Sequence, residues 1–124
     1  MTALVDTSVL VGEGQVQPGM AGEDWAVSTV TVGELEAGVL LAASPAVRAA
    51  RLRRLASILA EAPALPVDRD VAARYGELRA ATGRLPSNDL WIAATALAYD
   101  FTLVTADERQ AALPLVRSAL MPRV

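Results

Sequence analysis

Short apolar runs alternate with longer segments of helical periodicity along the 124-residue chain. The runs at 3–5, 25–28 and 102–105 are too short for helices and are typical of strands. A brief strand between two prolines, ending at Val67, and a last strand at 115–116 complete the expected set. A stretch rich in glycine and proline over 12–22 predicts a loop after the first strand.

The segments between the strands predict helices, and capping residues set their expected limits. The expected caps are Thr29 or Thr31, Ser44 with proline after it, Asp68, and Ser87 or Asn88, while Gly83 is expected to end the third helix. The helices then cover 31–43, 45–61, 69–82, 89–100 and 108–112. Strands that alternate with helices predict an α/β fold: an α/β/α sandwich around a mostly parallel sheet of about four to five strands.

The length and the apolar content indicate one soluble domain over residues 1–124. Hydrophobic residues make up 53% of the chain, which is enough for a packed core. The longest apolar stretch, 90–99, is about half as long as a membrane span requires. The N-terminus has no basic segment ahead of its apolar run, as a secretory signal would have, so the expected location is the cytoplasm.

The residue types that are missing exclude most enzymatic chemistries. The chain has no cysteine and no histidine, and all 11 of its basic residues are arginine. Thiol nucleophiles, thiolate zinc sites, Ser-His-Asp triads, P-loops and lysine Schiff bases are therefore excluded. Any catalysis must depend on carboxylates, hydroxyls, arginine or a metal, and hard oxygen ligands suit Mg²⁺ or Mn²⁺.

Four carboxylates, Asp6, Glu34, Asp89 and Asp107, are expected at one edge of the sheet. Asp6 and Asp107 follow predicted strands, and Glu34 and Asp89 lie in the first turns of predicted helices. Ligands of open parallel sheets bind beyond the carboxyl ends of the strands, where these acids would meet. Four such acids repel one another strongly unless a divalent cation holds them.

Each of these acids also has a purely structural interpretation. Asp6 and Asp107 can cap the short helices that follow them, and Glu34 and Asp89 can be acids that the dipole favours near a helix start. Helical spacing places Glu34 and Gly38 roughly 40° apart, which leaves room for a ligand beside the acid, whereas Glu36 lies about 200° away and is expected at the surface.

Four motifs, taken together, resemble those of PIN-domain proteins, specifically the VapC type of toxin from bacterial toxin–antitoxin pairs. They are D-T-S at 6–8, E-L-x-x-G at 34–38, N-D-x-x-I-A-A-T-A at 88–96 and L-V-T-A-D at 103–107. The match covers nearly the whole chain, in the order and approximate spacing of the family.

The resemblance implies a ribonuclease that uses Mg²⁺ or Mn²⁺. Carried over by position, Asp6, Glu34, Asp89 and Asp107 are the metal-binding and catalytic acids, and Ser8 and Thr105 support them. The resemblance further implies an RNA substrate, a homodimer and inhibition by a cognate antitoxin. In this mechanism a metal-activated water attacks the phosphate, Glu34 or Asp89 accepts its proton, and the products carry a 5′-phosphate and a 3′-hydroxyl.

The net charge of −3 does not exclude RNA, because removing 4 of the 14 acids leaves 10 against 11 arginines. Arg84 is the best candidate for a phosphate contact. The arginines of 48–54 are expected on a solvated helix face, with RNA or antitoxin contact as alternatives. Trp91 is expected in the core rather than as a platform for a base.

Three other functions share parts of this pattern. A signalling receiver domain is expected to use a lysine, which this chain lacks. A haloacid-dehalogenase-like phosphatase needs a second acid two residues after the first, where Ser8 stands. A catalytically silent PIN-like module that binds RNA or protein stays open at this stage.

Overall fold

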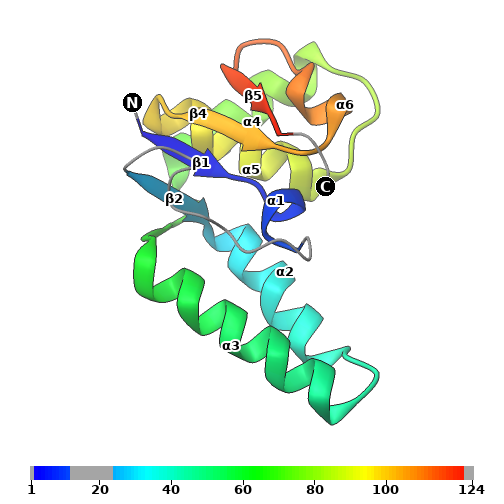
Figure 1. Ribbon diagram of the computed structural model, residues 1–124. Coiled ribbons are helices and arrows are strands. Elements are labelled where there is room, and N and C mark those ends of the chain that lie inside the picture. The colour runs from blue at the N-terminus through cyan, green and yellow to red at the C-terminus, as the bar shows by residue number, and fades with distance from the viewer. Residues whose placement is uncertain (1, 12–23, 122–124) are drawn as a thin grey trace.

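A parallel five-stranded sheet lies at the centre of the protein, as the computed structural model, which describes residues 2–11 and 24–121, shows (Figure 1). The strand order is β3-β2-β1-β4-β5, and each neighbouring pair runs parallel. The strands are β1 (Ala3–Val5), β2 (Trp25–Ser28), β3 (Ala64–Leu65), β4 (Thr102–Thr105) and β5 (Ser118–Leu120). Their carboxyl ends therefore meet at one edge. The loop expected over 12–22 lies outside the described residues.

Helices connect the strands and confirm the expected α/β class. They are α1 (Thr7–Leu10), α2 (Thr29–Leu40), α3 (Pro45–Glu61), α4 (Arg69–Ala81), α5 (Ser87–Tyr99) and α6 (Glu108–Ala111). Ser44 and Asp68 cap α3 and α4 as expected, since their side chains accept from the backbone N–H groups of Val47 and Val71. In the described part of the chain, no helix is both long and apolar enough to cross a membrane.

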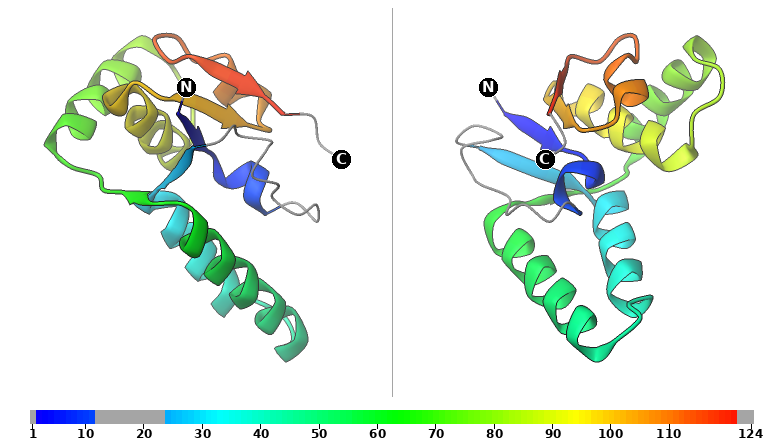
Figure 2. Two further views of the ribbon diagram at one scale, coloured as in Figure 1. Left: turned by 60° about the vertical axis from the view of Figure 1, so that its left-hand side comes forward. Right: turned by 45° about the vertical axis from the view of Figure 1, so that its right-hand side comes forward.

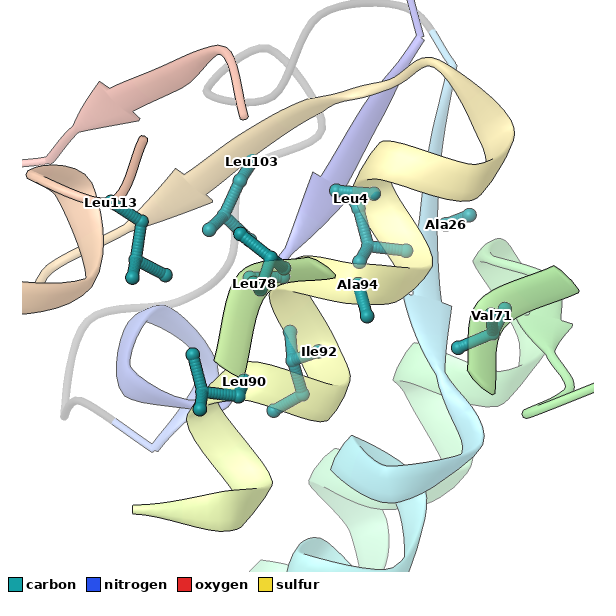
Figure 3. Packing of buried hydrophobic residues seen from close by; sticks show 11 residues of the cluster. Leu4, Ala26, Val71, Leu78, Leu90, Ile92, Ala94, Leu103 and Leu113 are labelled. Carbon is teal, nitrogen blue, oxygen red and sulfur yellow. The ribbon is translucent and has the colours of Figure 1, made fainter. Parts of the chain in front are cut away.

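Alternate side chains of the central strands enter two hydrophobic cores on opposite faces of the sheet. In β1, Leu4 packs in the core formed with α4 and α5, whereas Ala3 and Val5 pack in a second core with Leu10 and Ile58. Figure 3 shows the first core, in which α5 lies directly against the strands. Side chains alternate in this way because successive residues of a strand point to opposite faces of the sheet. When both faces are buried, the sequence of each strand is a continuous apolar run.

Helices α2 and α3 form a hairpin that projects from the sheet (Figure 2). Its apolar side chains are in part exposed: Leu40 and Leu41, where α2 ends, are 71% and 80% exposed. The arginines of α3 do more than line a solvated face. Arg48 and Arg51 donate to the carbonyls of Leu40 and Gly38, two of the last carbonyls of α2, which have no partner within that helix.

Two helices begin earlier than the sequence indicated. Ser28, the last residue of β2, caps α2 by accepting from the N–H of Val30, so Glu34 lies in the second turn of the helix rather than the first. Helix α5 begins at Ser87, so neither Ser87 nor Asn88 is its cap. Pro86 occupies the N-cap position in an extended conformation, and no side chain among the described residues caps this helix.

Two other local predictions differ from the structure: Gly83 follows the C-cap Thr82 as expected but without the expected conformation, and the last strand lies elsewhere. Helix α4 ends at Ala81 with Thr82 extended, and Gly83 does not adopt the left-handed conformation expected of a terminating glycine. The last strand is Ser118–Leu120 rather than 115–116, because Leu115 has a φ of 73° and cannot lie in a strand. Pairing with β4, and not a pattern of its own, makes 118–120 a strand.

Candidate active site

Asp6 lies directly after β1 and is 3% exposed. Its Oδ2 accepts from the backbone N–H of Ser8, 3.0 Å away, so Asp6 does cap α1 as the structural interpretation expected. Capping accounts for one oxygen. The other, Oδ1, is buried and has no hydrogen-bond partner among the described residues. A buried carboxylate oxygen without a donor is costly, and a cation is the natural partner for it.

Glu34 comes to the same edge from α2 and is held by a hydroxyl of α1. The Thr7 hydroxyl donates to Glu34 Oε1 over 2.6 Å and lies 3.0 Å from the hydroxyl of Thr31, which is fully buried. A short hydrogen bond to an ionised acceptor is stronger than one between neutral groups. Thr7 therefore fixes Glu34 against α1, one residue from Asp6.

Asp89 lies in the first turn of α5, and the pKa of its carboxyl is raised from 3.8 to about 6. Burial is the main cause, and the charges of Asp6, Asp107 and Glu34 add to it, in that order. A like charge disfavours ionisation only when it is near. The other three predicted acids therefore lie within electrostatic reach of Asp89 at this edge of the sheet.

Asp107 follows β4 and caps α6. Its Oδ1 accepts from the N–H of Arg109 over 2.9 Å, and its Oδ2 lies 3.7 Å from the guanidinium of the same residue. The side chain is 23% exposed, so this ion pair is open to solvent and weak. Asp107 is thus more exposed than Asp6, and its carboxylate is engaged by a residue two positions along the chain.

A buried network of hydroxyls and one amide supports these acids. The hydroxyl of Thr105 lies 3.3 Å from Asp6 Oδ2, 3.2 Å from Ser8 Oγ and 2.7 Å from Gln110 Oε1. Ser8 Oγ accepts from the N–H of Ala106, and Thr105 Oγ1 from that of Asp107. Ser8 and Thr105, expected as supporting residues, do lie beside Asp6. Gln110 was not foreseen, because it belongs to none of the recognisable motifs.

The donor set is entirely oxygen, which suits Mg²⁺ or Mn²⁺. Asp6 Oδ1 has no protein partner among the described residues, and the pKa of Asp89 is raised because burial and the neighbouring acids outweigh the opposing charge of Arg109. Both features are those of a site that a cation would complete. The described residues nevertheless contain no group of three or more carboxylates already gathered around one point.

The remaining candidates, Arg84 and Trp91, lie in different settings. Arg84 is exposed on the loop before α5. Trp91 packs partly buried against the core, as expected, and stacks on Tyr75 with ring centroids 3.9 Å apart. One face of the Trp91 ring is therefore already covered, which weakens its alternative interpretation as a platform for a base.

Four carboxylates at the carboxyl edge of a parallel sheet define an α/β protein with an acidic functional site. The comparisons with known proteins identify its family. The PIN domain model matches residues 3–115, so the chain belongs to the PIN-domain family. Ribonuclease VapC4 of Mycobacterium tuberculosis is 42% identical over 119 residues, covering 90% of this chain and 91% of that protein. Ribonuclease VapC5 of the same organism is 38% identical over 128 aligned positions, covering 98% and 94%.

A solved structure shows the same likeness in three dimensions. The crystal structure of VapBC-5, a member of the VapBC family of toxin–antitoxin systems from Mycobacterium tuberculosis, matches with a TM-score of 0.84 and 35% sequence identity, covering 97% of this chain and 98% of that one. The resemblance to PIN domains of the VapC type, drawn from the four motifs, is thereby confirmed.

Proposed function

We propose that the protein is an endoribonuclease toxin of the VapC type that depends on Mg²⁺ or Mn²⁺. One observation carries the proposal: Oδ1 of Asp6 is buried without a partner among the described residues, and burial together with three neighbouring acids raises the pKa of Asp89. The names of the relatives, both ribonucleases, support the substrate class.

In this proposal Asp6, Asp89 and Asp107 hold the cation, and Glu34 binds it directly or through water. A bound divalent cation supplies an activated water and compensates charge on the phosphate. Glu34 keeps a fixed orientation through the Thr7 hydroxyl, and Glu34 or Asp89 accepts the proton of that water. In-line attack by water then leaves a 5′-phosphate and a 3′-hydroxyl.

A titration with Mn²⁺ tests the metal site. Millimolar Mn²⁺ is expected to raise the melting temperature of the wild-type protein, because a ligand that binds only the folded state stabilises it by about 2.7 kcal/mol at a hundred times its Kd. Asp6→Asn is expected to lose this response. Glu36→Gln, an exposed acid two residues from Glu34, is the control and should keep it.

Mapping the ends of cleaved RNA tests the chemistry. Products with 5′-phosphates agree with attack by water, whereas cyclic-phosphate ends would contradict it. If Mn²⁺ stabilises the protein but no RNA is cut, the chain is a silent PIN-like binding module and the enzymatic proposal is wrong.

The proposed partner is a cognate antitoxin, in keeping with the VapBC system to which the matched structure belongs. A groove of about 250 Å³ lies between α1, α2 and α3, and Glu34 borders it, so that an occupant would also cover the acidic edge. Its lining is largely apolar: Leu10, Val11, Leu35 and Leu55, with Gly38, Arg51 and Arg54. We propose that an apolar segment of the antitoxin occupies this groove.

Gly38 allows a direct test, because a Cβ at this position meets nothing within 4 Å. Gly38→Phe is expected to fill the groove and to abolish binding of the cognate antitoxin, measured by calorimetry, with the fold intact. Gly76→Phe in α4, where a Cβ also meets nothing within 4 Å, is the matched control. Equal antitoxin binding by both variants would place the antitoxin elsewhere.

The homodimer, the phosphate contact of Arg84 and the cytoplasmic location stay predictions. Sedimentation velocity tests the dimer. The salt dependence of RNA binding by Arg84→Ala tests the phosphate contact, because losing one such contact reduces the salt slope.

A further inference from the structure

Gln110 is a fully buried polar side chain beside the acidic cluster. It lies in α6, three residues after Asp107, and its two polar atoms reach different parts of the site. Nε2 donates to the backbone carbonyl of Asp89 over 3.0 Å, and Oε1 accepts from the hydroxyl of Thr105 over 2.7 Å. Gln110 is thus a bridge between α5, which carries Asp89, and the end of β4.

The direction of both bonds is fixed by chemistry. A carbonyl oxygen can only accept, so the amide nitrogen of Gln110 must face Asp89 and its oxygen must face Thr105. Because that oxygen can only accept, the Thr105 hydroxyl must donate to it. A hydroxyl has one proton, and the contact to Gln110 at 2.7 Å is much shorter than the one to Asp6 Oδ2 at 3.3 Å.

The carboxylate of Asp6 consequently keeps lone pairs that no hydroxyl donor occupies. With the proton of Thr105 taken by Gln110, Asp6 Oδ2 accepts from the N–H of Ser8 and Oδ1 has no partner among the described residues. A carboxylate that few donors satisfy is a better ligand for a cation than one that a hydroxyl has partly neutralised.

The same residue steadies the start of α5. No side chain among the described residues caps this helix, whose N-cap position is Pro86. The bond from Gln110 to the carbonyl of Asp89 therefore anchors the first turn of α5 from outside the helix. Removing a partner that orients a metal ligand in this way typically lowers the metal affinity by about 10–100-fold.

We infer that Gln110 is a positioning residue of the active site: its amide takes the Thr105 proton away from Asp6 and holds the first turn of α5, which presents Asp89. This inference rests on the proposed metal-dependent activity. In the described part of the chain, Gln110 donates to the Asp89 backbone and accepts from Thr105 rather than bonding to either carboxylate, so it acts through Thr105 and the backbone.

Gln110→Met tests this role, because methionine keeps the length of the side chain and loses both hydrogen bonds. Thr95→Val is the matched control: Thr95 is fully buried in α5, and its hydroxyl donates to the carbonyl of Trp91, so this variant also loses a buried hydrogen bond. Two quantities are measured on both variants, namely the Mn²⁺ dissociation constant by electron paramagnetic resonance and, without metal, amide hydrogen exchange along α5.

Gln110→Met is expected to weaken Mn²⁺ binding by about tenfold and to speed exchange in the first turn of α5 more than in later turns. RNA cleavage by this variant should recover when Mn²⁺ is raised to saturation, which a merely unstable variant would not show. Thr95→Val should keep the wild-type Mn²⁺ affinity. Equal Mn²⁺ affinity in the two variants, or uniform exchange along α5, would overturn the inference.

These measurements distinguish a failure of the proposed metal-dependent function from a failure of the role of Gln110. If the wild-type protein itself binds no Mn²⁺, the proposed function is wrong, and the hydrogen exchange of the metal-free variants alone decides whether Gln110 anchors α5. Faster exchange confined to the first turn in Gln110→Met would then support the anchoring role, and its absence would refute it.

Discussion

The acidic edge of the sheet and the α2–α3 hairpin are built in opposite ways. At the edge, polar side chains such as Asp6, Thr105 and Gln110 are buried. Thr105 donates to Gln110, and Oδ1 of Asp6 has no partner among the described residues. In the hairpin, apolar side chains such as Leu41 and Leu52 are exposed, at 80% and 54%. The first region therefore buries polar groups of the candidate site, and the second exposes apolar surface to solvent.

This difference separates two tasks of one small domain. A reactive carboxylate must be held in a fixed place, which requires partners on several strands and helices. A recognition surface needs exposed apolar area, which is unfavourable in the free protein and favourable in a complex. Glu34 lies where the two regions meet, because it belongs to the acidic edge and also borders the groove of the hairpin.

The largest expected contrast is in packing. Ile92→Ala removes a fully buried side chain of α5 and is expected to lower the free energy of unfolding by about 3 kcal/mol. Leu52→Ala in the hairpin should change it by less than about 0.5 kcal/mol. Urea denaturation at equilibrium measures both, and a similar loss in the two variants would mean that the hairpin is packed as tightly as the body.

Next in size is the effect on cleavage. Glu34→Gln is expected to lower the cleavage rate by about a hundredfold, because the neutral amide neither attracts a cation nor accepts a proton. Glu36→Gln, on the same helix and exposed, should stay near the wild-type rate. Initial rates on one RNA at fixed Mn²⁺ give the comparison. Equal losses in both variants would remove Glu34 from the site.

The third prediction concerns pH and Asp89 without metal. The folded pKa of about 6 lies above the ordinary 3.8, so ionising this group costs stability above pH 6, and that cost disappears as the pH falls to about 4. Asp89→Asn should therefore be more stable than the wild type at pH 7.5, by about 1 kcal/mol once solvent screening is allowed for. The gain should vanish near pH 4, as urea denaturation at both values would show; a constant difference would contradict the assignment.

The smallest effect is expected in the hairpin. Gly38→Ala should stabilise the protein by about 0.5 kcal/mol, since alanine restricts the unfolded chain and its Cβ meets nothing within 4 Å. Thermal unfolding of the metal-free protein measures this gain. A loss of stability instead would show that the groove beside Gly38 is already filled.

Much of the fold was predictable because it depends on local patterns. Three strands, the caps Ser44 and Asp68, and the parallel α/β class follow from short apolar runs and capping chemistry. Helix starts were less accurate, because Ser28 is at once the last residue of β2 and the cap of α2. Strand β5 was missed, since 118–120 has no alternation of its own and becomes a strand through its pairing with β4.

The candidate site shows the same division. Each acid could be named from its motif, and for Asp6 and Asp107 the structural interpretation also holds, because both cap helices. Motifs cannot show that one oxygen of Asp6 caps while the other is unpartnered, or that Thr7 holds Glu34. Those facts depend on distances between segments far apart in the chain.

The sequence by itself determined the family, the α/β class and the chemical repertoire, because motif spacing, strand and helix periods and the lack of cysteine, histidine and lysine are properties of the chain alone. Only the tertiary structure decided that Gln110 joins Thr105 to Asp89, that arginines of α3 cap α2, and that burial raises the pKa of Asp89. The physical reason is the short range of these interactions. Hydrogen bonds and desolvation act over a few ångströms in space, and the residues that share them here lie on different elements of the fold.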